Sequence, residues 1–513
     1  MSSSVPPVPA APRATRRDWI GLAVLALPCF LVAMDMTVLN LAIPLLSADL
    51  HPTGTQLLWI VDIYGFLIAG SLMTMGTLGD RIGRRRLLLV GATAFGLAST
   101  AAAFARSAEM LIAMRGLLGV AGATLAPSTL SLIRNMFLDE RQRTVAITVW
   151  MTSFSVGGAI GPLVGGVLLE HFWWGSVFLT NVPVMVLLLV LGPMLLPEFK
   201  DPAAGNLDLR SAGLSLGAVL ALIYGLKRFA ESGADALTAT AVLGGLLLGF
   251  VFVERQRRLP YPFLDLALFR RREFGAALTM NLLVIVALFG LFFLVSQYLQ
   301  LVLGLSPLRA GLTFVPASIA FIAGSVFVPA LSRRFRPGTL IAAGLLLAAP
   351  GLFLMTTLET KSGVAFVVLG TIVYQLALTP VFTLSTAIVV GSAPPERAGA
   401  AAAISETSYE LGGALGVATL GTLGTFLYRS RLVGAVGPDS PGELTAAAKG
   451  TLGAVVAMAS RVGDAGTTKL LIAAKQAFVD AVHTIAMIGG GLFVALAVFA
   501  AVLLRHATLG EQH

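Results

Sequence analysis

The stretch LLWIVDIYGFLIAGSLMTMGTLGDRIGRRR at residues 57–86 decides the fold class of this chain. Its first 20 residues contain one charged side chain, Asp62, and its last six contain four arginines. A helix needs about 20 apolar residues to cross the hydrocarbon core of a bilayer. Arginine and lysine are enriched in loops on the cytoplasmic side of a membrane. The stretch therefore predicts a membrane-spanning helix that ends at a cytoplasmic loop.

The composition of the whole chain indicates that lipid is its main solvent. Of the 513 residues, 57% are hydrophobic and 12% are charged, whereas soluble proteins carry about 25% charged residues. Transmembrane β-strands would give short segments of alternating hydrophobicity, but the apolar stretches between Trp19 and Leu504 are long. We therefore expect an all-α polytopic membrane protein.

The apolar stretches predict fourteen membrane-spanning helices, and an even number places both termini on one side. The predicted spans are 19–44, 57–76, 87–105, 109–134, 144–169, 175–196, 207–228, 237–254, 274–302, 309–330, 338–358, 365–390, 398–428 and 477–504. Of the 35 basic residues, 23 lie in segments on the side of the termini and five in short segments on the other side. Because this excess marks the cytoplasmic side, we expect both termini in the cytoplasm and the chain in the bacterial inner membrane. The same distribution accounts for the net charge of +9, so no nucleic-acid partner is predicted.

The order of the spans predicts two six-helix halves with an inserted helix pair between them. A basic loop follows the second helix of each half, at residues 79–86 and 331–338, as a duplicated six-helix unit predicts. The predicted segments are a disordered cytoplasmic tail at 1–18, an N-terminal half at 19–196, an inserted pair at 207–254, a C-terminal half at 274–504 and a cytoplasmic tail at 505–513.

The segment 429–476 is predicted to be an external loop of the C-terminal half. Only 11 uncharged residues lie between Lys449 and Arg461, which is too few for a span. A helical hairpin that rests at the membrane surface would also fit this segment.

Several classes of protein are disfavoured by what the sequence lacks. Cys29 is the only cysteine, so no intramolecular disulfide is possible. The five histidines show no HxxxH or HExxH spacing, and no metal site is expected. The chain has no GxxxxGK motif followed by Ser or Thr and no nucleophile–base pattern. Neither ATP-driven transport by this chain nor an enzymatic activity is predicted, and no cofactor is expected.

Four acidic residues lie at depth within the predicted spans, away from the span ends, and we interpret them as candidate proton-coupling groups. They are Asp35, Asp62, Glu406 and Glu410. A charge at the middle of a bilayer costs at least about 2.5–3.5 kcal/mol on insertion scales, so such acids are functional hypotheses by default. Movement of Arg115, in the fourth span, toward or away from Asp35 or Asp62 would release or bind a proton. A structural pair between Asp62 and Arg115 fits equally well.

Glu406 and Glu410 are four residues apart and therefore share one face of a helix. Two carboxylates so placed in a low dielectric resist ionising together, so at least one is expected to carry a proton. A cationic compound would relieve their repulsion, and competition between that cation and protons is the simplest exchange mechanism. The alternative is a water-lined structural pair near the cytoplasmic side.

Glycines and a charged loop are the candidate conformational elements. Gly157, Gly161 and Gly165 repeat every four residues and predict a smooth helix surface for close packing. Pro162 is expected to bend the same helix, because it removes a backbone hydrogen bond.

A latch is predicted in the basic loop that follows the second span. We expect Asp80 to face a helix N-terminus of the other half and Arg84 to pair with Asp139 or Glu140.

Aromatic side chains on the predicted spans would supply an apolar pocket that attracts cations. Each of them singly would also fit lipid contact or core packing. The candidates are Trp59, Tyr64, Trp150, Phe154, Phe292, Tyr298, Tyr374 and Tyr409.

Motifs along nearly the whole chain point to one family. They are MDMTVLNLAIP at 34–44, WIVDIY at 59–64, GTLGDRIGRRR at 76–86, Arg115 with Gly119, Gly122 and Ala123, GGAIGPLVGG at 157–166, QYLQLVLG at 297–304 and AISETSYELG at 403–412. Together and in this order they resemble the major facilitator superfamily, specifically its fourteen-helix drug:proton antiporters such as the Qac-type quaternary-ammonium exporters. The resemblance implies the major facilitator fold and proton coupling through the acids and Arg115. It also implies conformational roles for Gly76, Arg81 and Gly83 beside the predicted latch.

The sequence therefore predicts a proton-coupled multidrug antiporter that exports lipophilic cations, such as quaternary ammonium compounds, dyes and antiseptics. We expect a monomer, driven by the proton gradient, that interacts with these small molecules, protons and membrane lipid. The chain departs from the family pattern in the span 309–330, where the resemblance implies a further acid in multidrug members and this sequence has none. Divalent cations, which gain from additional carboxylates, are therefore expected to be handled less well than monovalent ones. The alternatives are an exporter of an endogenous lipid, metabolite or self-made antibiotic, and a transporter-like lipid-binding or sensing protein.

Overall fold

The computed structural model describes residues 13–200, 208–259, 266–361, 363–393, 398–435, 451–462 and 465–505. Every regular element in these ranges is a helix. Fourteen helical segments are long and apolar enough to cross a membrane by length and composition. For the described ranges, the prediction of an all-α protein with fourteen spans is confirmed.

The N-terminal half forms six spans from eight helices. These are α1 (Arg16–Leu50), α2 (Gly54–Ile82), α3 (Arg84–Ala103), α4 (Ala108–Gly122), α5 (Leu125–Met136), α6 (Glu140–His171), α7 (Ser176–Leu179) and α8 (Asn181–Leu195). The helices α4 and α5 make one span across a short break, at which the Thr124 hydroxyl donates a hydrogen bond to the Ala121 carbonyl at 2.7 Å. The helices α7 and α8 likewise form one span.

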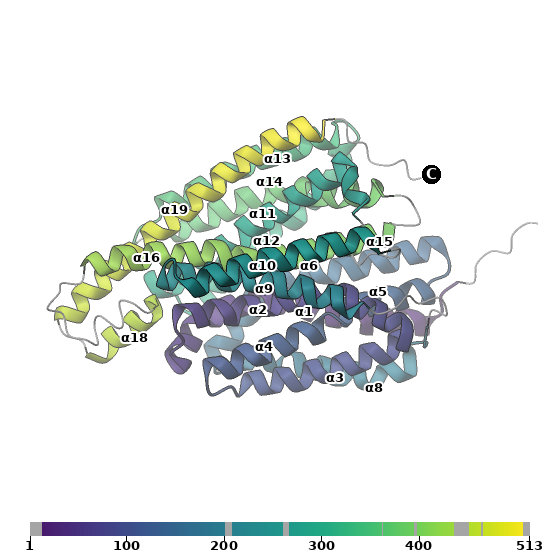
Figure 1. The fold of residues 1–513 in the computed structure, drawn as a ribbon, viewed down its shortest axis with the longest axis horizontal. Helices are drawn as coiled ribbons and strands as arrows, with labels where there is room; N and C mark the ends of the chain where they lie inside the picture. Colours follow the sequence, from purple (N-terminus) through teal and green to yellow (C-terminus); the bar gives the residue numbers. More distant parts are fainter. Residues whose placement is uncertain are drawn as a thin grey trace, which may run out of the picture.

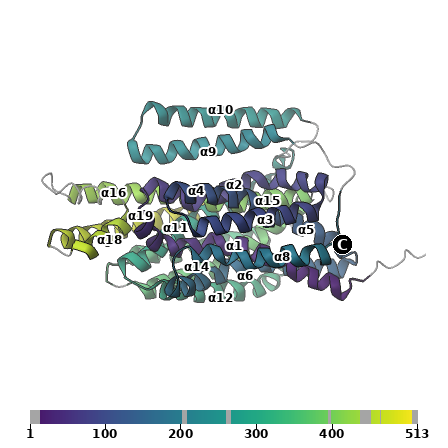
Figure 2. The same cartoon turned by 90° about the horizontal axis from the view of Figure 1, so that it is seen from below.

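The inserted pair consists of α9 (Leu209–Ser232) and α10 (Ala236–Arg258). Figure 2 shows α10 on the outside of the molecule and α9 between α10 and the rest of the bundle. The face of α10 that points away from α9 carries large exposed apolar side chains, as a helix in contact with lipid requires. They include Leu243, Leu246, Leu247 and Phe250.

The C-terminal half again supplies six spans. It contains η1 (Leu268–Arg270), α11 (Arg272–Gln297), η2 (Tyr298–Val302), α12 (Pro307–Ser332), α13 (Pro337–Phe353), η3 (Leu354–Thr357), α14 (Val364–Gly391), α15 (Ala398–Gly416), η5 (Val417–Gly421), α16 (Thr422–Ala435), α18 (Leu452–Val462) and α19 (Ala465–Leu503). The π-helical turn η5 joins α15 and α16 into one span.

The long helices run side by side, so their ends gather at two ends of the bundle (Figure 1). We call the end at which α1 begins and α19 ends the terminal end. The helix α2 also ends at the terminal end, and α3 begins there and runs toward the opposite end. At the opposite end, α16, α18 and the beginning of α19 extend past the other helices (Figure 1).

Several predicted boundaries are corrected by the structure. The first helix begins at Arg16 rather than at residue 19, because Thr15 and Asp18 form a capping box at its start. Helices also occupy both ends of the predicted loop 429–476, since α16 continues to Ala435 and α19 begins at Ala465. Charged residues lower the hydropathy at the start of α19, and the predicted span therefore began only at residue 477. A helix can continue through charged residues where it lies outside the hydrocarbon core. Residues 1–12, 394–397, 436–450 and 506–513 of the predicted tails and loops lie outside the described residues.

Close contacts of α6 join the first half to the second. A Cβ atom at Gly157 would lie 2.2 Å from the Phe30 carbonyl oxygen of α1, and one at Gly161 would overlap Thr37. On α12, a Cβ atom at Gly311 would lie 2.1 Å from the Pro162 carbonyl oxygen of α6. The predicted close packing is therefore present, and it places α6 directly against both α1 and the opposite half.

Candidate functional site

A cavity of about 1060 Å³ lies between the two halves. It is lined by α1, α2, α5 and α6 from one half and by α11, α12, α14 and α15 from the other, with Arg84 of α3 and Asp208 before α9 at its edge. Its lining begins near the middle of the bundle, at Ala33 and Leu72, and reaches the last turns of α2 at Gly76 and Asp80. The cavity therefore extends from the centre of the protein to the terminal end.

Two carboxylates from one helix face this cavity. Glu406 and Glu410 both line it, as their four-residue spacing on α15 predicts. Glu410 is 4% exposed, and its Oε2 atom has no hydrogen-bond partner among the described residues. No ion pair within the described part of the chain includes either carboxylate. Among the described residues, the cavity thus holds two acids that form no ion pair.

The rest of the lining is mainly apolar and aromatic. Five predicted aromatic residues line the cavity, namely Trp150, Phe154, Phe292, Tyr374 and Tyr409. Several rings pack edge to face, with centroids 4.9 Å apart for Trp150 and Phe154 and 6.2 Å apart for Phe289 and Tyr409. Rings in this arrangement leave faces available to a cation.

Three predicted aromatic residues are not in the cavity lining. Trp59 and Tyr64 lie against cations on other elements, and the Tyr298 hydroxyl donates a hydrogen bond to the Glu359 carbonyl at 2.7 Å. Sequence reasoning missed four phenylalanines that do line the cavity, which are Phe289, Phe314, Phe321 and Phe382. The seven-residue spacing of Phe314 and Phe321 was the available signal, because it places both on one helix face.

A buried ion pair joins Asp35 of α1 to Arg115 of α4. Arg115 is 1% exposed, and its Nε donates a hydrogen bond to the Ile60 carbonyl at 3.1 Å. Its guanidinium also lies over the Tyr64 ring, 4.4 Å from the centroid. Neither Asp35 nor Arg115 lines the cavity, but the next two residues of α1, Met36 and Thr37, do. The pair therefore lies directly behind the cavity wall.

A second buried ion pair joins Asp62 of α2 to Lys227 of the inserted helix α9. The Lys227 Nζ is 2.7 Å from the Asp62 Oδ2 and 3.9 Å from the centroid of the Trp59 ring. The predicted pair of Asp62 with Arg115 is therefore wrong in this structure, because each acid has its own cation. Sequence reasoning counted Lys227 with the outer loops since it is near the end of its span. The position of Lys227 inside an apolar run was the signal that this lysine lies within the membrane part of the protein and not in a loop.

The two residues of the predicted latch, Asp80 and Arg84, bind each other. Arg84 binds Asp80, with the Nη2 atom 2.6 Å from Oδ1, whereas the Asp139 carboxylate accepts a hydrogen bond from the Gln142 backbone N–H at the start of α6. The prediction that Arg84 pairs with Asp139 or Glu140 is wrong, and Asp80 binds Arg84 in place of a helix N-terminus. The cause is local, because Gly83 at φ 112° turns the chain between α2 and α3 and brings residues 80 and 84 together. Arg81 beside them is exposed.

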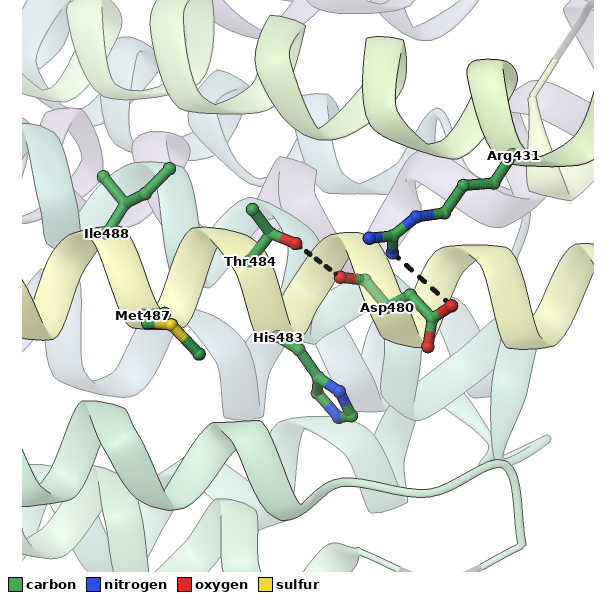
Figure 3. Close-up of a pocket in the computed structure, with 6 residues that line it drawn as sticks. All are labelled: Arg431, Asp480, His483, Thr484, Met487 and Ile488. Atoms are coloured by element: carbon green, nitrogen blue, oxygen red, sulfur yellow. Dashed lines mark hydrogen bonds and ion pairs between the residues drawn. The ribbon is translucent and has the colours of Figure 1, made fainter.

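A smaller hollow between α16 and α19 shows no comparable chemistry. Figure 3 shows Asp480 bound to Arg431 at 3.4 Å and the Thr484 hydroxyl hydrogen-bonded to the Asp480 carbonyl at 2.9 Å. The His483 ring contacts the Leu358 carbonyl at 2.8 Å. Because its acid and base neutralise each other, this hollow carries no argument for function.

A bundle of fourteen spans around a cavity that is open at one end is the architecture of a membrane transporter. The family model of the Major Facilitator Superfamily matches residues 25–417, and the chain belongs to this superfamily. The protein is therefore a multi-pass bacterial membrane protein that transports small molecules, and it is not an enzyme.

Curated relatives cover nearly the whole chain. The multidrug efflux pump LfrA of Mycolicibacterium smegmatis is 44% identical over 505 residues, which cover 98% of this chain and 100% of the relative. The methyl viologen resistance protein SmvA of Salmonella typhimurium is 36% identical, with 93% and 96% covered. The tetracenomycin C resistance and export protein of Streptomyces glaucescens is 34% identical, with 83% and 79% covered.

Solved structures share the fold at low sequence identity. A bacterial homologue of the human lysosomal transporter Spinster, in an inward-facing and unoccupied conformation, matches with a TM-score of 0.65 and 17% identity. The match covers 96% of this chain and 99% of that one. A peptide transporter POT in complex with sulfate matches with a TM-score of 0.62 and 18% identity, covering 95% of both chains.

Proposed function

We propose that this protein is a proton-coupled antiporter that exports lipophilic cations across the bacterial inner membrane. The observation that carries the proposal is the presence of two unneutralised carboxylates, Glu406 and Glu410, inside an aromatic cavity. A flat or alkylated cation gains from the ring faces and from the negative charge at once. With both termini in the cytoplasm, the cavity faces the cytoplasm and is open to compounds inside the cell.

The energy comes from protons and needs no cofactor. Protons and the cation compete for the two glutamates, so protonation from outside would displace a bound cation there. Asp35 and Arg115 form the second part of the mechanism, because a proton on Asp35 would free Arg115 and change the contact between α1 and α4. We propose that one chain is sufficient, since the cavity is complete within it.

The first experiment measures ethidium efflux from loaded cells with and without a protonophore. Efflux of the wild type should stop when the protonophore collapses the gradient. Glu406→Gln and Glu410→Gln should each lower the efflux rate by about tenfold, because each removes a proton-exchanging charge from the cavity. Glu273→Gln is the matched control, since Glu273 lies outside the cavity lining.

Efflux that continues at the wild-type rate in both cavity variants would contradict the assigned roles of these acids. Absence of ethidium efflux by wild-type protein that is folded and in the membrane would instead favour export of a different compound class. A self-made antibiotic would then be the leading candidate, because one relative is named for tetracenomycin C export.

A further inference from the structure

The inserted helix pair is held to the N-terminal half along one antiparallel seam between α2 and α9. At the end of the seam that lies away from the terminal end, Lys227 binds Asp62. Ile223 and Phe66 follow as members of one apolar cluster, and Leu216 then packs against Gly70. The contact at Gly70 is close enough that a Cβ atom there would overlap the Leu216 side chain. The charged contact is therefore one end of a continuous packed surface.

Lys227 takes an unusual position for a lysine near the end of a membrane span. Such lysines ordinarily extend along the helix so that the ammonium reaches the polar interface. Lys227 is 1% exposed and points into the bundle toward Asp62 and Trp59. The neighbouring Arg228 behaves in the ordinary way, because it is partly exposed and binds Asp235 in the turn at 2.6 Å. The inward direction of Lys227 is therefore specific to Asp62.

Asp62 is separated from the cavity that holds the proton-exchanging glutamates. Its side chain is buried, α9 covers it from the lipid side, and the cavity lining on α2 begins only ten residues later, at Leu72. Asp35, in contrast, is followed at once by the lining residues Met36 and Thr37. A group that carries protons across a membrane must meet water on each side in turn. Asp62 instead has the Lys227 ammonium 2.7 Å from its Oδ2 atom.

We propose that Lys227 and Asp62 form a clasp that fixes the inserted pair to the N-terminal half, and that Asp62 exchanges no proton during transport. Lys227 is thus a positioning residue. This inference rests on the proposed export function and assigns Asp62 a part in it that differs from those of Asp35 and the cavity glutamates.

The clasp determines which surface moves when the two halves rock. Phe66 of α2 and Ile223 of α9 share an apolar cluster with Ala414 of α15 and Ala418 of η5. Because the clasp joins α9 to α2, the inserted pair moves with the N-terminal half. Ala414 and Ala418, together with Leu411 and Leu415 that pack against the cluster, form the apolar surface of the opposite half against which this unit moves.

A double-mutant cycle tests the clasp. Asp62→Asn and Lys227→Met each leave one buried charge without its partner, so each should lower ethidium efflux by about tenfold and lower the melting temperature in detergent. The combined Asp62→Asn/Lys227→Met variant removes both charges at similar volume and should restore efflux and melting temperature close to wild type. Its pH profile of efflux should superimpose on that of the wild type.

Two controls make the result specific. Arg228→Met removes the adjacent positive charge of α9, which forms a partly exposed ion pair with Asp235, and should change neither measurement. The parallel Asp35→Asn/Arg115→Met variant should stay inactive, because Asp35 has a coupling role that a neutral pair cannot supply.

The proposal is overturned if the combined variant is stable but inactive, or if its pH profile shifts, since either result gives Asp62 a role in proton exchange. If the neutral pair does not reach the membrane, the reversed pair Asp62→Lys/Lys227→Asp must restore efflux, and its failure also overturns the proposal. If the wild type does not export ethidium, the proposed function fails, while the melting temperatures of the four proteins still decide whether the clasp exists.

Discussion

Asp35→Asn is expected to reduce energy-dependent ethidium efflux to the level of cells that lack the protein. The substitution removes the candidate proton site and leaves Arg115 buried without its partner. Breaking a buried ion pair on one side costs roughly 3–5 kcal/mol. The loss should therefore exceed that of any substitution at an exposed charge, and it is measured as the initial efflux rate at equal protein abundance in the membrane.

Two comparisons separate a coupling role from unfolding in this experiment. Asp35→Glu keeps the carboxylate and should retain part of the efflux. Purified Asp35→Asn protein in vesicles should still exchange ethidium for ethidium when no proton gradient is applied, since the cavity is intact. Full energy-dependent efflux by Asp35→Asn would exclude Asp35 from the mechanism.

Gly157→Ala is expected to destabilise the protein strongly, whereas Gly158→Ala is expected to be tolerated. Replacing glycine by alanine inside a helix normally gains roughly 0.5–1 kcal/mol. At Gly157 this gain is reversed, because the new methyl group would lie 2.2 Å from the Phe30 carbonyl oxygen and α1 and α6 would have to separate. Overpacking of this kind costs typically about 1–3 kcal/mol, and backbone atoms adapt less than side chains.

The adjacent Gly158 makes a matched control, because no atom lies within 4 Å of its Cβ position. The measurement is the melting temperature of the purified protein in detergent, together with ethidium efflux. We expect a lower melting temperature and loss of efflux for Gly157→Ala and an unchanged melting temperature for Gly158→Ala. The melting temperature is the readout for the control, because Gly158 lines the cavity. Equal melting temperatures for the two variants would show that the α1–α6 contact is looser than the structure indicates.

The fold and the cavity acids were predictable because each follows from a strong local signal. A run of about 20 apolar residues predicts a span whatever surrounds it. An acid inside such a run, such as Glu406 or Glu410, is conspicuous for the same reason. The family resemblance then supplied the order of the helices, which the runs alone do not determine.

The partners of the charged residues were harder to predict, because pairing depends on contacts between distant elements. Asp62 has Arg115 in the same half. The position of Lys227 in an apolar run marks it as unusual, but the sequence does not indicate that its partner is Asp62 of α2. The pairing predicted for Arg84 was wrong for the opposite reason. A more distant partner was expected, but its partner Asp80 is only four residues away. Aromatic residues were predictable as a group, but the helix face that points into the cavity is set by packing.

The length of α19 has a practical consequence for imaging this protein. Its 39 residues correspond to about 58 Å at 1.5 Å per residue, which exceeds the about 40–45 Å of a bilayer with its headgroups. The first turns of α19 must therefore stand clear of a detergent micelle, and α18 packs beside them. Transporters without soluble domains give electron microscopists few features by which to orient single particles. Here α16, α18 and the start of α19 form an off-centre landmark, at which an antibody fragment could be attached far from the cavity.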